Sequence, residues 1–160
     1  MQMLLFALDA NTLEQLILNA QQPQDIIDCD AILYRLQLDE NWQALDALLQ
    51  SDPVLKEALH PIHPLTTRTL QGVKAHYNTV VRVSDVYDAL NHLESSEVIQ
   101  EKQVKQIQAA SIEREDSVNE LLASLHLSFN QLQNFYYHAA EHNLVVVSLQ
   151  GEKLVATGYF

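Results

Sequence analysis

The chain has 160 residues, enough for one domain that buries about two thirds of the surface exposed by its unfolded chain. It carries 21 Asp and Glu against 9 Lys and Arg, a net charge of −12. This balance argues against sequence-independent nucleic-acid binding and against attraction to anionic membranes, whereas it suits a basic protein partner.

The cysteine content and the N-terminus bear on localisation. Cys29 is the only cysteine, so the chain has no internal disulfide. Residues 1–8 contain a short apolar run with no basic residue before it, which is too short for a signal peptide or a membrane span. We therefore expect a cytoplasmic protein with one domain over residues 1–160.

Apolar runs and helical stripes alternate in the first half of the chain. Residues 3–8 predict a strand, and Asp9 or Asn11 can cap a helix that ends at Pro23. Residues 26–36 predict a second short helix, and Asp39 is the expected N-cap of a third helix that contains Trp42. Prolines interrupt residues 51–72, which predict a loop with one helical turn at 54–59 and room for a short strand at 66–70.

Stronger patterns follow in the second half. The β-branched residues at 78–83 predict a strand, and Ser84 is the expected N-cap of a helix through residue 93. A further helix is predicted over 95–109 and a long one over 118–142, which a capping box at Ser128 could divide in two. The apolar run at 144–149 predicts a buried strand, and residues 154–159 could return as an edge strand.

These elements predict one α+β domain in which several helices pack on a small mixed β-sheet. Its strands are expected near residues 3–8, 78–83 and 144–149. An open edge on the last strand could also pair two copies into a homodimer.

Two segments resemble a known family. Residues 36–45 read LQLDENWQAL, and residues 129–141 read FNQLQNFYYHAAE before the apolar run at 145–147. They are similar to a helix start and to the closing helix and strand of the YfbM-like family, small bacterial proteins described as a domain of unknown function. The resemblance implies the family's fold and no activity. The chain departs from the family at residues 60–64, which replace a Gly-rich segment, and at residues 112–116.

Histidine pairs are the candidates for metal binding. His138, Glu141 and His142 have the H-x-x-E-H spacing of inverted zinc peptidases, but only 18 residues follow in which a third ligand could lie. His60 and His63 lie in a proline-rich loop, with His76 the nearest further ligand. We favour helix-end and surface-loop roles for these histidines, and we predict no metal.

Catalytic motifs are missing from the sequence. Cys29 lies between Asp28 and Asp30, and not beside a cationic group that would activate a nucleophile. The chain has no phosphate-binding loop and no nucleophile-elbow motif, and it contains three glycines. We therefore predict no cofactor and no catalytic residue.

The carboxylates carry the functional prediction. We predict a non-enzymatic, acidic interaction protein, in its most concrete form an immunity-type inhibitor that neutralises a basic bacterial effector. The predicted partner-binding residues are Asp25, Asp28, Asp30, Glu40, Asp46, Glu113, Glu115, Asp116 and Tyr137. The alternative is a small hydrolase or ligand-binding protein, and a deep pocket in which His60, His63 or His76 meets a carboxylate would favour it.

Overall fold

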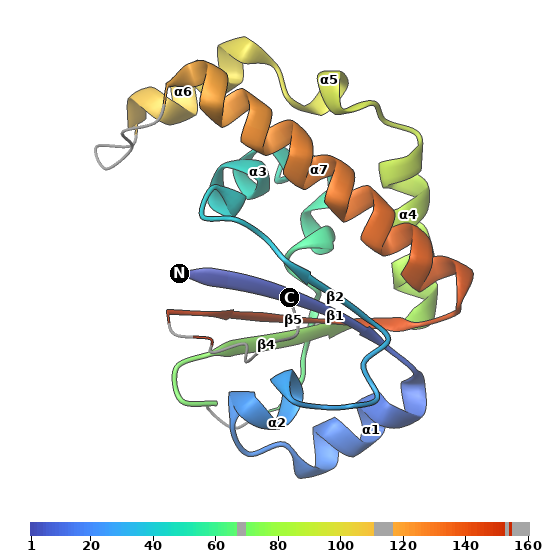
Figure 1. Ribbon diagram of the computed structural model, residues 1–160. Helices are drawn as coiled ribbons and strands as arrows, with labels where there is room; N and C mark the ends of the chain where they lie inside the picture. The colour runs from blue at the N-terminus through green and yellow to red at the C-terminus, as the bar shows by residue number, and fades with distance from the viewer. Residues whose placement is uncertain (67–69, 111–116, 153, 155–160) are drawn as a thin grey trace.

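A five-stranded sheet separates two helical layers, as Figure 1 shows for the computed structural model. The structure describes residues 1–66, 70–110, 117–152 and 154. The strands are β1 (Gln2–Leu8), β2 (Tyr34–Gln37), β3 (His63–Pro64), β4 (Lys74–Asn78) and β5 (Val145–Gly151). They lie in the order β2-β1-β5-β4-β3, and each neighbouring pair is antiparallel.

The lower layer consists of α1 (Ala10–Asn19) and α2 (Pro23–Ile27), beneath the sheet in Figure 1. Asp9 caps α1 because its carboxylate accepts a hydrogen bond of 2.7 Å from the backbone N–H of Thr12. Alternate strand residues point to this layer, since residues two apart in a strand share a face. The lower core contains Leu4, Phe6, Leu8, Val145, Val147 and Leu149, packed with Leu13, Leu16, Ile26 and Ile27.

The upper layer contains the remaining helices, which cross the other face of the sheet (Figure 1). They are α3 (Trp42–Leu49), the 3-10 turn η1 (Leu55–Ala58), α4 (Val80–Asn91), α5 (Ser95–Val98), α6 (Glu101–Ala110) and α7 (Val118–Glu141). Helix α7 supplies the largest apolar stripe of this layer, formed by Leu121, Leu125, Phe129, Leu132, Tyr136 and Ala139. This stripe packs in one core with Met3, Leu5, Ala7 and Val146 of the sheet.

The structure confirms the α+β class and several predicted elements. β1, α3, η1, α7 and β5 lie where the apolar patterns predicted them. α1 begins as predicted but ends at Asn19, and Pro23, which was expected to end it, is the first residue of α2. Helix α7 runs without a break through Ser128, which is buried, so the predicted division into two helices does not occur. Asn41, and not Asp39, occupies the N-cap position of α3. None of the described helices combines the length and apolar content required to cross a membrane.

The predicted strand at residues 78–83 is wrong. β4 ends at Asn78, and α4 begins at Val80 with Thr79 at its N-cap position. Val83, Val86 and Leu90 recur at helical spacing and are fully buried against the upper layer. Burial of this helical face outweighs the β-propensity of the branched residues, and the predicted cap Ser84 therefore lies inside the helix.

The sheet also has more strands than expected, and its described pairings are all antiparallel where a mixed sheet was expected. Residues 34–37 form β2, although the apolar pattern predicted a helix through Leu36. Leu36 pairs with Leu5, so tertiary pairing with β1 decides the conformation of this short segment. The predicted strands at 66–70 and 154–159 fall mostly on residues outside the described part of the chain.

Candidate functional site

Two adjacent cavities lie at the corner of the upper layer, and His60 lines both of them. The larger cavity, of 560 Å³, is lined by Asp46, Gln50, Lys56, Glu57, His60 and Ile62. The smaller cavity, of 260 Å³, is lined by His60, Pro61, Lys74, His76, Ser148 and Gln150. We call these two cavities together the His60 pocket.

An aspartate from α3 orients His60. The Oδ2 atom of Asp46 lies 3.0 Å from Nε2 of His60, and its Oδ1 atom accepts a hydrogen bond of 2.8 Å from the side chain of Gln50. The Asp46 side chain is 19% exposed and that of His60 is 40% exposed, so the pair is open to solvent from one side. The His60 ring also faces the buried Trp42, with 6.3 Å between the ring centroids. His60 thus has an ion-pair partner in α3 and an aromatic neighbour, although it lies in a loop.

The sheet forms the floor of the smaller cavity. Lys74 and His76 are alternate residues of β4, and Gln150 and Ser148 are their respective partners in β5, so all four share the upper face. Burial lowers the pKa of His76 below its usual value, and the positive charges of His60 and Lys74 lower that pKa further. His76 is therefore more readily neutral than an exposed histidine.

Buried polar contacts anchor the segment that leads to His60. The side-chain amide of Asn78 donates a hydrogen bond of 3.0 Å to the Glu57 carbonyl, and the Tyr136 hydroxyl donates one of 2.6 Å to the Ala58 carbonyl. The Glu57 carboxylate, 7% exposed, is paired with Arg82 of α4. Burial raises the pKa of Tyr136, so its hydroxyl remains a donor at all ordinary pH values. Two helices and one strand thus fix η1, which ends two residues before His60.

The comparisons with known proteins place the fold in a family and leave its activity open. The match to the family described as domain of unknown function (DUF1877) spans residues 1–149. The chain belongs to this family. A crystal structure of a protein of unknown function, YfbM from Escherichia coli, is similar with a TM-score of 0.70 and 19% sequence identity over 93% of this chain and 99% of that chain. No curated protein matches the chain significantly.

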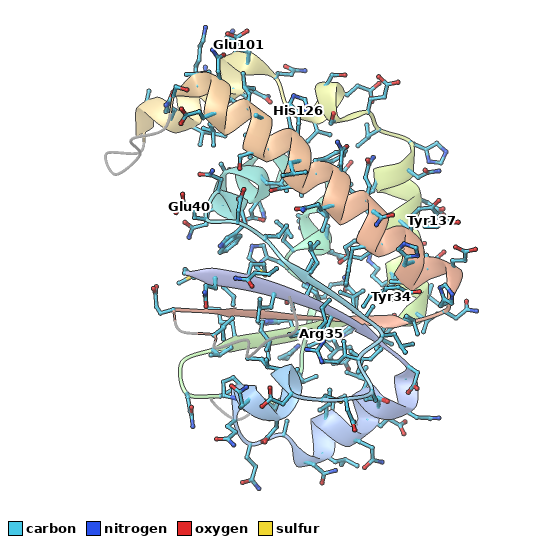
Figure 2. The ribbon with its side chains drawn as sticks, in the orientation of Figure 1. Tyr34, Arg35, Glu40, Glu101, His126 and Tyr137 are labelled. Atoms are coloured by element: carbon cyan, nitrogen blue, oxygen red, sulfur yellow. The ribbon has the colours of Figure 1, made fainter. Side chains whose placement is uncertain are left out.

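This DUF1877 chain does not gather its predicted partner-binding residues on one surface. Asp25 and Asp28 lie on or directly after α2 in the lower layer, and Asp30 follows them. Asp46 lies in α3 and Glu40, labelled in Figure 2, lies just before it, and α3 is across the sheet from α2 (Figure 1). Glu113, Glu115 and Asp116 lie outside the described residues. Among the predicted partner-binding residues that the structure describes, Asp46 alone lines the His60 pocket.

Local structure accounts for Asp25. Its carboxylate accepts hydrogen bonds of 2.8 Å and 3.1 Å from the backbone N–H groups of Gln21 and Gln22. These bonds lower the pKa of Asp25, because they stabilise its ionised form. Asp25 therefore has a structural role at the start of α2.

Tyr137 belongs to a row of contacting rings at the C-terminal end of α7, in which Figure 2 labels Tyr137 and Tyr34. Tyr34 of β2 stacks on His138 with 4.9 Å between centroids, and Tyr137 contacts both His138 and Tyr87 of α4. Tyr137 is 42% exposed. A hydrogen bond to the Glu141 carboxylate raises the pKa of its hydroxyl. The row therefore presents an aromatic surface beside a carboxylate.

The H-x-x-E-H spacing does not produce a metal site in the structure. Both His138 and His142 have ring contacts with Tyr34, and Nδ1 of His142 lies 2.9 Å from the His138 carbonyl. His63 stacks on Tyr77, so it has a different partner from His60. Across the described residues, no group of three or more His, Cys, Asp or Glu side chains could hold a metal ion.

Sequence reasoning named His60 and His76 but missed Lys74, Ser148 and Gln150. A signal for these residues exists in the two strands. Lys74, His76 and Asn78 are polar at every second position of β4, as are Ser148 and Gln150 in β5. Such alternation predicts a polar strip on one face of a sheet. The pairing of the two strands was needed to bring the strips together.

Proposed function

We propose that this protein binds a small polar ligand in the His60 pocket. The observation that carries the proposal is the convergence of Asp46, His60 and His76, from a helix, a loop and a strand, on two adjacent cavities. Ligand sites are concave and position a small number of polar groups on a rigid scaffold. The anchoring of η1 by Asn78 and Tyr136 supplies that rigidity around His60.

A screen of small metabolites by thermal shift, followed by calorimetric titration, tests the proposal. We expect at least one class of compound to stabilise the protein, and we expect Asp46→Asn to weaken its binding about tenfold because His60 loses its orienting charge. Asp28→Asn is the matched control, since it makes the same change on the exposed end of α2. Equal binding to all three proteins would overturn the assignment to this pocket.

The same pair also suits a hydrolase, because a carboxylate that orients an imidazole produces an effective general base. Ligand binding is the broader proposal, and turnover is a separate question about any compound that binds. Product formation from a bound ester or phosphoester, lost in His60→Gln, would add catalysis to binding. If the bound compound is unchanged after prolonged incubation, the pocket binds that compound without catalysing its hydrolysis.

A second candidate function is the acidic interaction protein, including the immunity-type inhibitor of a basic effector. The exposed Tyr137 in its row of rings favours this candidate, since partly exposed tyrosines commonly anchor protein interfaces. The net charge of −12 would attract a basic partner over a distance.

A pull-down from native lysate at about 50 mM and about 300 mM salt tests the second candidate. We expect a stoichiometric basic partner that is weakened by salt and lost with Tyr137→Ala. Leu18→Ala is the control, because Leu18 is an exposed residue of the opposite layer. A partner retained equally by both variants would place the interface elsewhere.

A further inference from the structure

The smaller cavity of the His60 pocket is lined by hydrogen-bond donors. Lys74 contributes an ammonium group, His60 and His76 contribute imidazoles, and Ser148 and Gln150 contribute a hydroxyl and an amide. Among the described residues that line this cavity, none carries a carboxylate. A site of this composition is complementary to oxygen acceptors that carry negative charge.

This composition contrasts with the rest of the molecule, which has more than twice as many carboxylates as cationic side chains. Arg82 is engaged with Glu57 and Asp85, and Lys105 with Glu101. In the described part of the chain, Lys74 makes no ion pair with a carboxylate, although it lies beside two histidines. The charges of Lys74 and of a protonated His76 repel each other, and a bound anion would offset that repulsion.

The larger cavity differs in its charged lining. Asp46 and Glu57 line it together with Lys56, so two carboxylates face one ammonium group, and a second anionic group is less favoured there than beside Lys74 in the smaller cavity. The two cavities meet at His60, whose ring lines both. A ligand that spans them would therefore place an anionic group on one side of His60 and an uncharged or cationic remainder on the other.

We propose that the smaller cavity binds the anionic group of the ligand, a carboxylate or a phosphate, while the uncharged or cationic remainder lies in the larger cavity. This inference rests on the proposed function, because it names the chemical class of ligand for the same pocket. Lys74 provides the fixed positive charge, and Ser148 and Gln150 provide neutral donors from the sheet. Asp46 keeps His60 oriented at the junction of the two cavities.

His76 makes the binding of such an anion depend on pH. The titratable and charged groups around it are Lys74 on its own strand, His60 from the loop, and Asp46 behind His60. An anion in the cavity favours the protonated imidazole, so binding takes up a proton and affinity rises as the pH falls. Sulfate is a suitable probe, since its own charge does not change between about pH 5.5 and pH 8, where an ordinary histidine titrates.

The test uses the full chain and three probes, inorganic phosphate, acetate and sulfate, titrated at constant ionic strength set with chloride. Binding is followed by NMR through the backbone amides of residues 74–76 and 148–150 and the His76 imidazole. We expect saturable shifts confined to these groups, with Lys74→Gln weakening the affinity about tenfold or more. Lys102→Gln is the control, because it removes an exposed charge on α6.

The probes also separate the two sources of the anion. Tighter binding of phosphate than of acetate would identify a phosphate ligand, and the reverse order would identify a carboxylate. Sulfate affinity should rise from pH 8 to pH 5.5 in the wild-type protein, and this rise should be smaller in His76→Gln. Ser148→Ala gives a second, uncharged change of the same cavity, and the thermal midpoint of each variant checks that it is folded.

Three results would overturn the inference. The cavity would have no anion site if the chemical shifts of residues 74–76 did not saturate, or if Lys102→Gln lowered the anion affinity as much as Lys74→Gln. Binding of neutral or cationic compounds in the His60 pocket, with none of the three anions bound, would reject the anion class and leave the proposed function standing. Failure of every compound to bind, whatever its charge, would reject both.

Discussion

The upper face of the sheet differs between the region under α7 and the corner at β4. Leu5, Ala7 and Val146 lie under the helices and are fully buried in an apolar core. The strand register makes the boundary sharp, since Leu5 pairs with Ser148 and Ser148 pairs with His76. The upper face of the sheet therefore supports the apolar core at β1 and at Val146 of β5, and it forms the polar cavity at β4 and at Ser148 and Gln150 of β5.

The lower face of the same strands serves as a reference. There Leu4 pairs with Leu149, which pairs with Ala75, and the row stays buried and apolar across all three strands. The chain can thus maintain an apolar row as far as β4 when a helical layer covers it. The polar residues of the upper corner are accordingly a local feature of the His60 pocket, and the following changes test this comparison.

The largest expected effect is on the covered side of the boundary. Leu5→Ala should lower the free energy of unfolding by about 2–5 kcal/mol, because it leaves a cavity under α7. Ser148→Ala, its direct neighbour in β5, should change that free energy by less than about 1 kcal/mol. Urea denaturation of both variants measures the difference. Equal losses would mean that the corner is packed as tightly as the core.

A smaller loss of unfolding free energy is expected at Tyr136, where the upper core contacts η1. Tyr136→Phe removes the hydrogen bond to the Ala58 carbonyl and should cost about 1–2 kcal/mol of unfolding free energy, since that buried acceptor loses its donor. The His60 imidazole should also become more mobile, which NMR relaxation detects. Tyr137→Phe is the control and should stay within about 0.5 kcal/mol, because Tyr137 is 42% exposed and its hydroxyl lies at the surface beside the Glu141 carboxylate.

A substitution that extends the apolar row should separate stability from function. Ser148→Val places two methyl groups at the edge of the smaller cavity and should raise the free energy of unfolding by about 1 kcal/mol. The same variant should lose affinity for any ligand of this cavity. Denaturation and titration of one sample measure both quantities. A lower free energy of unfolding with unchanged ligand affinity would mean that Ser148 stabilises the fold and does not contribute to the binding site.

The smallest expected effect is the pH dependence that His76 contributes. Its pKa is lower in the folded than in the unfolded protein, so the unfolded state binds more protons below about pH 6.5. The stabilisation is therefore present above that pH and is lost as the pH falls towards the lowered pKa. Thermal midpoints of wild type and His76→Gln between about pH 5 and pH 8 test the sign. A wild-type protein that gains stability relative to the variant at low pH would contradict it.

Local sequence patterns predict much of the fold. The sequence predicts β1, α7 and the start of α1 correctly. Each of these segments is long enough for its apolar pattern to distinguish a helix from a strand. Residues 78–83 and 34–37 were assigned incorrectly because both are short. Val83 faces the upper core from a helix, and Leu36 pairs with a strand, and neither contact is visible in the local sequence.

The residues of the candidate site also divide into those that the sequence predicted and those that only the tertiary structure revealed. The sequence alone determined an acidic α+β chain, its helical stripes and its buried central strands, because composition and periodicity are local properties. It also supplied the histidines of the pocket as isolated candidates. Only the tertiary structure decided that Asp46 orients His60, that Lys74 and His76 lie beside Ser148 and Gln150, and that the described members of the predicted acidic set fall on separate layers. Those relations depend on strand order and helix placement, which distant contacts determine.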